Sequence, residues 1–174
     1  MCNNGANKTG AGANAGGGMA NKKLVEIEGA GSDEHHVPYL PFFVYGTLRP
    51  GESNYARYIG GSTQTEEPAI LRPATLVTDG IYPYLIMAPD LAGPDDHVQG
   101  MLLTVRPERY LETLQRLDWL EDYKPFSPLS LYERIRQLVQ TEAGPVEAWM
   151  YVAGPWVLRN ARAGRLLKVA GGAW

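Results

Sequence analysis

The apolar residues of this chain fall into short runs separated by glycine, proline and aspartate, a pattern typical of strands joined by short links. The predicted strands cover residues 41–45, 69–78, 84–87, 97–105, 131–140 and 146–153. Ser53 can cap a short helix that runs through Ile59, and residues 157–168 are expected to form a last, more basic helix. Tight turns between strands favour an α+β fold, in which a mixed, mostly antiparallel sheet curls into a small barrel with flanking helices.

One further helix carries clear signals at both of its ends. Pro107 suits a first helical position, and the glutamate after it favours the positive N-terminal end of a helix. A proline three residues beyond position 122 forbids much continuation, so the helix is predicted to span residues 107–122. Asp118, near its C-terminal end, is expected to pair with Lys124 or Arg116.

The apolar stripe of this helix contains a carboxylate. At ~100° per residue, Leu114 and Leu117 share one narrow face, and Glu121 lies at the centre of that face one turn further on. A desolvated carboxylate has a pKa raised toward neutrality, which allows it to act as both acid and base near pH 7. The alternative is that the helix frays before Glu121, which would leave a solvated terminal side chain.

A loop with two glycines joins the first predicted strand to the short helix. Gly46 and Gly51 allow the backbone to approach a ligand closely. The N–H groups of such a loop, together with the start of the following helix, form a natural seat for an anion. Arg49 can add a positive charge. The alternative is an ordinary strand–helix turn with Arg49 in a surface ion pair.

The first 34 residues differ in composition from the rest of the chain. Gly, Ala and Asn dominate up to Gly18, and side chains able to form a core are nearly absent. Residues 1–34 are therefore expected to be a flexible tail. Residues 35–174 are expected to form a single domain, because a chain of 174 residues with 44% hydrophobic content suffices for one core.

Charge and composition narrow the class of protein further. The net charge of −3 and the scattered Lys and Arg disfavour a nucleic-acid partner. No apolar run approaches the ~20 residues of a membrane-spanning helix. Cys2 is the only cysteine and the three histidines show no metal-ligand spacing. We expect a soluble cytoplasmic protein, a monomer or weak dimer, with no metal, cofactor or membrane partner.

The loop and the end of the marked helix resemble two motifs of a known family. Residues 43–51, Phe-Val-Tyr-Gly-Thr-Leu-Arg-Pro-Gly, resemble the signature loop of the γ-glutamylcyclotransferase-like (AIG2-like) family, closest to its γ-glutamylamine cyclotransferase branch. Residues 117–123, Leu-Asp-Trp-Leu-Glu-Asp-Tyr, resemble the motif that carries the family's catalytic glutamate. Further matches in the same order extend the resemblance over residues 41–174. Asp122 departs from the pattern, because many members have glycine there.

The resemblance implies a six-stranded barrel with flanking helices and a cavity at its mouth. It also implies that the α-amine of a small γ-glutamyl substrate attacks its own γ-carbonyl, so that 5-oxoproline forms and an amine leaves. Because the nucleophile belongs to the substrate, the reaction needs no covalent intermediate, metal or cofactor. The γ-glutamylamine type is favoured over the glutathione type, although the substrate itself stays open.

The resemblance assigns the general acid/base role to Glu121. The other positions are expected to bind substrate: Tyr45 at the pocket floor, Gly46, Thr47 and Leu48 through their backbone, Arg49 by its charge, Tyr82 with Pro83 at the rim, and Tyr132 and Tyr151 as hydroxyls or walls. The competing interpretation is a non-catalytic small-molecule-binding module on the same barrel, which would bind γ-glutamyl compounds without turning them over.

Overall fold

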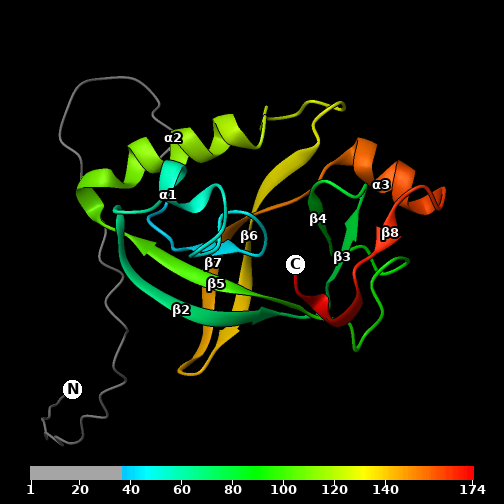
Figure 1. Ribbon diagram of the computed structural model, residues 1–174, viewed down its shortest axis with the longest axis horizontal. Coiled ribbons are helices and arrows are strands. Elements are labelled where there is room, and N and C mark those ends of the chain that lie inside the picture. The colour runs from blue at the N-terminus through cyan, green and yellow to red at the C-terminus, as the bar shows by residue number, and fades with distance from the viewer. Residues whose placement is uncertain (1–36) are drawn as a thin grey trace, which may run out of the picture. The chain divides into compact units, whose positions relative to one another are not determined.

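The computed structural model describes residues 37–174 (Figure 1). The predicted tail, residues 1–34, lies outside the described residues. The strands are β1 (Phe42–Val44), β2 (Thr63–Leu71), β3 (Thr75–Thr78), β4 (Pro83–Ile86), β5 (Val98–Val105), β6 (Tyr132–Thr141), β7 (Gly144–Ala153) and β8 (Leu167–Lys168). The helices are α1 (Tyr55–Tyr58), α2 (Tyr110–Leu120) and α3 (Pro155–Arg162), with 3-10 turns η1 (Pro107–Arg109) and η2 (Ala170–Gly172).

Five strands close into a barrel in the order β1-β5-β2-β6-β7. Neighbouring strands are antiparallel except at the closing pair, where β1 runs parallel to β7 and Phe42 lies opposite Trp149. This arrangement confirms the predicted α+β fold with a mixed, mostly antiparallel barrel. The barrel has five strands rather than six, because β3 and β4 leave it to form a second sheet with β8, in the order β4-β3-β8.

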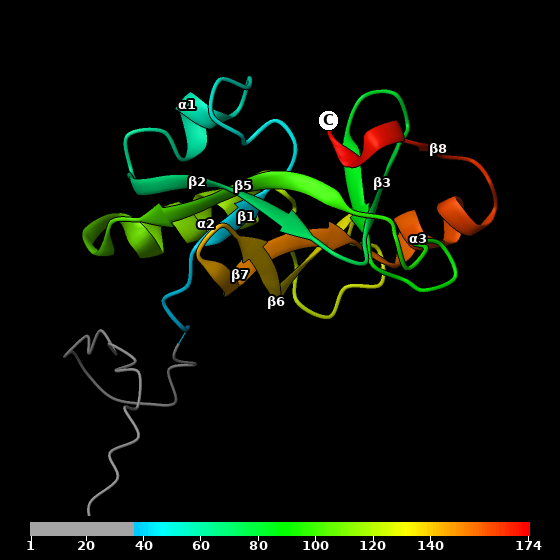
Figure 2. The ribbon, with the colours of Figure 1, turned by 90° about the horizontal axis from the view of Figure 1, so that it is seen from below.

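Two predicted elements have different bounds in the structure. The single strand predicted at residues 69–78 is two strands, β2 and β3, because Pro73 between them has no N–H to continue a ladder. The last helix, predicted at 157–168, ends at Arg162, and the chain returns as β8 to pair with β3. Figures 1 and 2 show α3 and the second sheet grouped at one side of the barrel.

Helix α2 packs onto the barrel through the predicted apolar stripe. Tyr110, Leu114 and Leu117 are all buried, and the Tyr110 hydroxyl lies within hydrogen-bond distance of the main-chain oxygens of Pro38 and Leu40, which share its single proton. Figure 1 shows α2 running past α1 alongside the barrel strands. The stripe therefore fixes how the C-terminal end of α2, where the candidate acid/base lies, meets the barrel.

Candidate active site

A cavity of about 360 Å³ opens beside the C-terminal end of α2. Its walls come from β1 and the loop after it, the turn between β3 and β4, the first residue after α2, and the start of β6. Eight of the nine predicted site residues line it: Tyr45, Gly46, Thr47, Leu48, Tyr82, Glu121, Tyr132 and Tyr151. The structure thus brings together residues that lie more than 100 positions apart in the chain.

Glu121 is the C-cap residue of α2, since the regular helix ends at Leu120. The helix is shorter than the predicted span 107–122, but the side chain is not solvated as fraying would require. It is partly buried and faces the cavity. Within residues 37–174 its carboxylate forms no hydrogen bond or ion pair, and burial raises its pKa to about 7.

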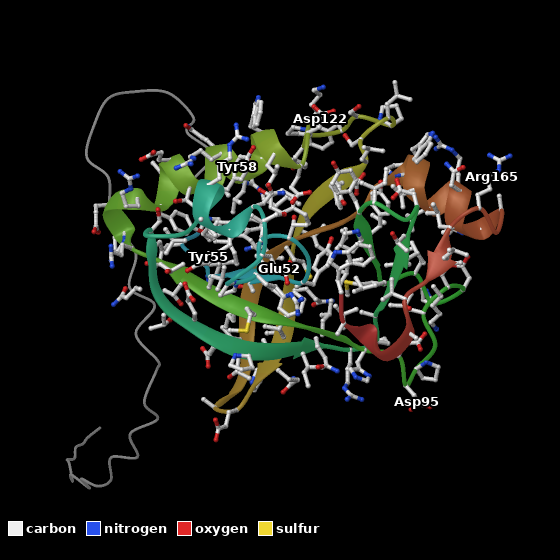
Figure 3. The ribbon with its side chains drawn as sticks, viewed as in Figure 1. Glu52, Tyr55, Tyr58, Asp95, Asp122 and Arg165 are labelled. Atoms are coloured by element: carbon white, nitrogen blue, oxygen red, sulfur yellow. The ribbon has the colours of Figure 1, made fainter. Side chains whose placement is uncertain are left out.

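The chain turns sharply after Glu121 through a left-handed residue. Asp122 has φ +46, its N–H donates to the Trp119 oxygen at 3.2 Å, and the Tyr123 N–H donates to the Asp118 oxygen at 2.9 Å. These two bonds define a Schellman motif, in which the left-handed position favours glycine. The departure at Asp122 is therefore accommodated, and it lies at the end of α2 in Figure 3.

We expect Asp122→Ala to be less stable than Asp122→Gly by about 1 kcal/mol, because the Cβ of alanine disfavours the left-handed conformation that glycine adopts freely. Both variants remove the exposed ion pair of Asp122 with Lys124, which contributes little. Urea unfolding of the two variants isolates the backbone effect. Equal stabilities would mean that the turn relaxes away from positive φ.

The loop after β1 lines the cavity and contains backbone N–H groups without a partner in the described chain. Within the described chain, the N–H groups of Gly46, Thr47 and Leu48 donate no hydrogen bond, whereas the loop's internal bonds use other donors. One of them, the Asn54 N–H, donates to the Thr47 oxygen at 3.0 Å, and the Asn54 side chain donates to the Thr47 hydroxyl at 3.0 Å. Such unpaired N–H groups suit an anion or a developing oxyanion.

Asn54 is a site residue that the sequence prediction missed. It lines the cavity and occupies the N-cap position of α1, which the prediction gave to Ser53. Asn is a frequent N-cap residue, and that preference was the signal available. Its side chain bonds to Thr47 instead of capping the helix, so it holds the loop in shape.

Arg49 does not line the cavity. Its guanidinium donates to the Glu52 carboxylate at 3.4 Å and to the main-chain oxygen of Trp174. Both contacts direct its charge away from the cavity lining, as in the surface-pair alternative. The structure therefore gives no support to Arg49 as a group that contacts substrate.

Three predicted tyrosines have their hydroxyl protons already donated. Tyr45 donates to the main-chain oxygen of Tyr151 at 2.8 Å, Tyr132 to that of Pro83 at 3.0 Å, and Tyr151 to the Asp118 carboxylate at 2.7 Å. Burial raises the pKa of all three well above the usual tyrosine value. They are neutral cavity walls rather than proton donors. Tyr82 is half-exposed at the rim.

Asp118 has different partners from those predicted. It pairs with Arg134 at 3.0 Å and accepts a hydrogen bond from Tyr151. The two predicted partners pair elsewhere, Lys124 with Asp122 and Arg116 with Glu112. The reason is tertiary, because β6 places Arg134 beside the last turn of α2. Asp118 and Arg134 lie outside the cavity lining and together adjoin it through Tyr151.

The charged residues of the cavity lining are both acidic. They are Glu121 and Asp122, and the lining residues in the described part of the chain include no Lys, Arg or His. Residues 37–174 contain no cluster of three or more His, Cys, Asp or Glu arranged to hold a metal ion. None of the helices described there is long and apolar enough to cross a bilayer.

The structure combines a closed barrel, a cavity beside it and, in the cavity lining, a carboxylate whose pKa is raised by burial. The sequence model of the family described as "Gamma-glutamyl cyclotransferase, AIG2-like" matches residues 42–174. The chain belongs to this family. Membership in this family supports γ-glutamylcyclotransferase as the general enzyme class of this protein.

Similarity to individual proteins agrees with this assignment. The chain is 34% identical over 116 residues to the gamma-L-glutamyl-butirosin B gamma-glutamyl cyclotransferase of Niallia circulans, covering 66% of this chain and 67% of the relative. It is 30% identical over 122 residues to a putative gamma-glutamylcyclotransferase of Drosophila melanogaster, covering 63% and 67%.

Solved structures show the same fold. An AIG2-like protein from Mus musculus superposes with a TM-score of 0.50 at 22% identity, covering 67% of this chain and 78% of the mouse chain. YkqA from Bacillus subtilis superposes with a TM-score of 0.52 at 18% identity, covering 78% of this chain and 39% of YkqA. At these identities the likeness concerns the fold alone.

Proposed function

We propose that the protein cyclises a γ-glutamyl amide to 5-oxoproline and a free amine, with Glu121 as general acid/base. The observation that carries the proposal is the carboxylate itself. It faces the cavity, it has no partner within residues 37–174, and burial raises its pKa to about 7. A carboxylate in that state can take a proton and return it at neutral pH. Family membership supports the reaction class.

The proton balance of this reaction needs only one such group. Glu121 takes a proton from the substrate's α-ammonium, and the freed amine attacks the γ-carbonyl to form the ring C–N bond. The tetrahedral oxyanion then collapses, which breaks the bond to the leaving nitrogen. The α-nitrogen loses two protons in all and the leaving nitrogen gains two, so the amine departs as ammonium and Glu121 ends as carboxylate.

The loop after β1 supplies the binding half of the site. Gly46, Thr47 and Leu48 line the cavity, and their unpaired N–H groups can hold the α-carboxylate or the oxyanion. The ring walls of Tyr45, Tyr132 and Tyr151 exclude water and favour the folded conformer in which the α-amine approaches the γ-carbon.

The charges of the lining favour a γ-glutamylamine over glutathione. A glutathione-type leaving group carries a carboxylate, and the described lining offers it no Lys, Arg or His. Asp122 at the cavity would repel such a group and would attract a cationic one. The Niallia circulans relative is named for γ-L-glutamyl-butirosin B, which is not glutathione.

A panel of γ-glutamyl amides tests the proposal. The leaving groups would be an alkylamine, a diamine, a neutral amino-acid and the cysteinylglycine of glutathione, with 5-oxoproline and free amine measured together. We expect kcat/KM to be about 10-fold or more higher for the two amines. Binding without turnover, seen as a ligand-dependent rise in Tm, would instead support the binding-module interpretation. A preference for glutathione would contradict the substrate class alone.

The rate should fall on the acid side of neutrality. Burial raises the pKa of Glu121 to about 7, so the carboxylate form that accepts the first proton is lost as pH falls through that value. We expect kcat/KM for a γ-glutamylamine to lose about 10-fold for each pH unit below 7. A profile that stays flat down to pH 5 would mean that the base is a group with an ordinary carboxylate pKa.

A further inference from the structure

The ion pair of Asp118 and Arg134 lies at the last turn of α2, next to the candidate acid/base in the chain. Its partners are 3.0 Å apart, and both side chains are largely covered, with Arg134 only 13% exposed. Neither residue lines the cavity. The pair therefore cannot contact a substrate held there, and any part it has in the reaction passes through other residues.

Arg134 contacts the chain on both sides of Glu121. It pairs with Asp118, three residues before, and its guanidinium lies 5.2 Å from the ring centre of Tyr123, two residues after. The ring of Trp149 covers the guanidinium at 4.9 Å. The side chain thus holds the last turn of α2 and the residue that closes the turn, with Glu121 between them.

The same network reaches the loop after β1. The Tyr151 hydroxyl donates to Asp118 at 2.7 Å, and the Tyr151 main-chain oxygen accepts from the Tyr45 hydroxyl at 2.8 Å. Tyr45 directly precedes the cavity-lining residues Gly46, Thr47 and Leu48, whose N–H groups donate no hydrogen bond within the described chain. Polar contacts at the side chain and at the main chain of Tyr151 therefore connect Arg134 and Asp118 with the residue at the start of this loop.

The turn that carries Glu121 needs such support. Helix ends fray when only their own backbone bonds hold them, and the left-handed residue here is Asp122 rather than the glycine that would adopt φ +46 without strain. A carboxylate on a frayed turn would rotate into solvent. It would then lose both its orientation toward the substrate and the burial that adapts it to acid/base chemistry.

We propose that Asp118 and Arg134 are positioning residues, which hold the last turn of α2 so that the Glu121 carboxylate faces the cavity in register with the loop after β1. This inference rests on the proposed function for its consequence on rate. What it says about structure is that the two residues keep the Glu121 carboxylate oriented and buried, and this can be measured without turnover.

The first test measures the Glu121 carboxyl by ¹³C NMR titration in Asp118→Asn and Arg134→Met, with the resonance assigned from Glu121→Gln. Loss of positioning should solvate the carboxyl in both variants, so the pKa of Glu121 should fall in both toward the ordinary glutamate value. A purely electrostatic role predicts opposite signs, because removing Asp118 lowers that pKa and removing Arg134 raises it. Opposite shifts, or no shift, would overturn the proposal.

The second test measures steady-state kinetics at a temperature where all variants are folded. We expect kcat to fall about 10-fold or more in each single variant, KM to change less than about twofold, and the double variant to be no slower than the worse single one. Independent, multiplying losses would contradict a single positioning unit.

Val139→Ala provides the matched control. Val139 is fully buried on β6, the strand that carries Arg134, and it lies outside the cavity lining. The substitution should lower Tm by several degrees and leave kcat and the pKa of Glu121 unchanged. If kcat fell in this control as it does in Arg134→Met, the rate loss would reflect general destabilisation, and the positioning role would be rejected.

Discussion

Glu121→Gln is expected to lower kcat by about 10²-fold or more while the protein keeps its fold. Gln has nearly the same size and shape as Glu, so the cavity walls need not move. It cannot accept the proton of the α-ammonium, so the nucleophile stays protonated and the leaving amine receives no proton from the enzyme. Release of 5-oxoproline from the best γ-glutamylamine of the panel measures the loss.

Glu112→Gln is the control for this substitution. Glu112 lies on the same helix, is exposed, and pairs at the surface with Arg109 and Arg116. We expect its kcat to remain within about twofold of the native value, because surface ion pairs contribute little. Equal turnover by the native chain and Glu121→Gln would remove Glu121 from the mechanism, whatever substrate the cavity binds.

Gly100→Ala is expected to lower the free energy of unfolding by about 3 kcal/mol, at the upper end of the usual cost of overpacking. Gly100 lies in β5, at a point where the neighbouring strand β1 approaches it closely. A Cβ there would lie 2.4 Å from the main-chain oxygen of Val44 and 2.7 Å from the ring of Phe43. Because both belong to β1, which leads into the cavity-lining loop after it, activity should fall together with stability. Urea unfolding measures the first effect.

Gly93→Ala gives the comparison for Gly100→Ala. A Cβ at position 93 would meet its nearest atom, an oxygen of Asp96, at an ordinary 3.6 Å. We expect this variant to lose less than about 1 kcal/mol. Similar unfolding curves for the two variants would contradict this prediction, because they would show that β1 can shift away from β5 at little cost in free energy.

The parts of the fold that follow a local periodicity were predictable from the sequence. The stripe of Tyr110, Leu114 and Leu117 is buried as its helical spacing predicted, and it placed Glu121 on the face that meets the barrel. The strand β2 was predicted poorly, because Gln64, Thr65 and Glu66 lie exposed in its first half and carry no apolar signal. Its pairing with β5, rather than its own sequence, makes that segment a strand.

The supporting contacts of the site were not predictable in the same way. Asp118 and Arg134 are 16 residues apart on different elements, so their pairing depends on how α2 lies against β6. Sequence spacing suggested nearer partners for Asp118, and it gave Arg49 a charge near the loop without showing where its guanidinium points. Both outcomes reflect tertiary geometry, which one sequence does not encode in any local pattern.

The burial of Glu121 also makes the stability of the protein depend on pH. A carboxyl whose pKa rises from 4.5 unfolded to about 7 folded holds its proton more tightly in the native state, so folding is favoured at acid pH. The protein loses that stability progressively between pH 4.5 and 7, so that above pH 7 it is less stable than at acid pH by on the order of 3 kcal/mol. If Glu121 has the acid/base role proposed above, the conformational stability of the protein is lowest at the pH where that base is ionised.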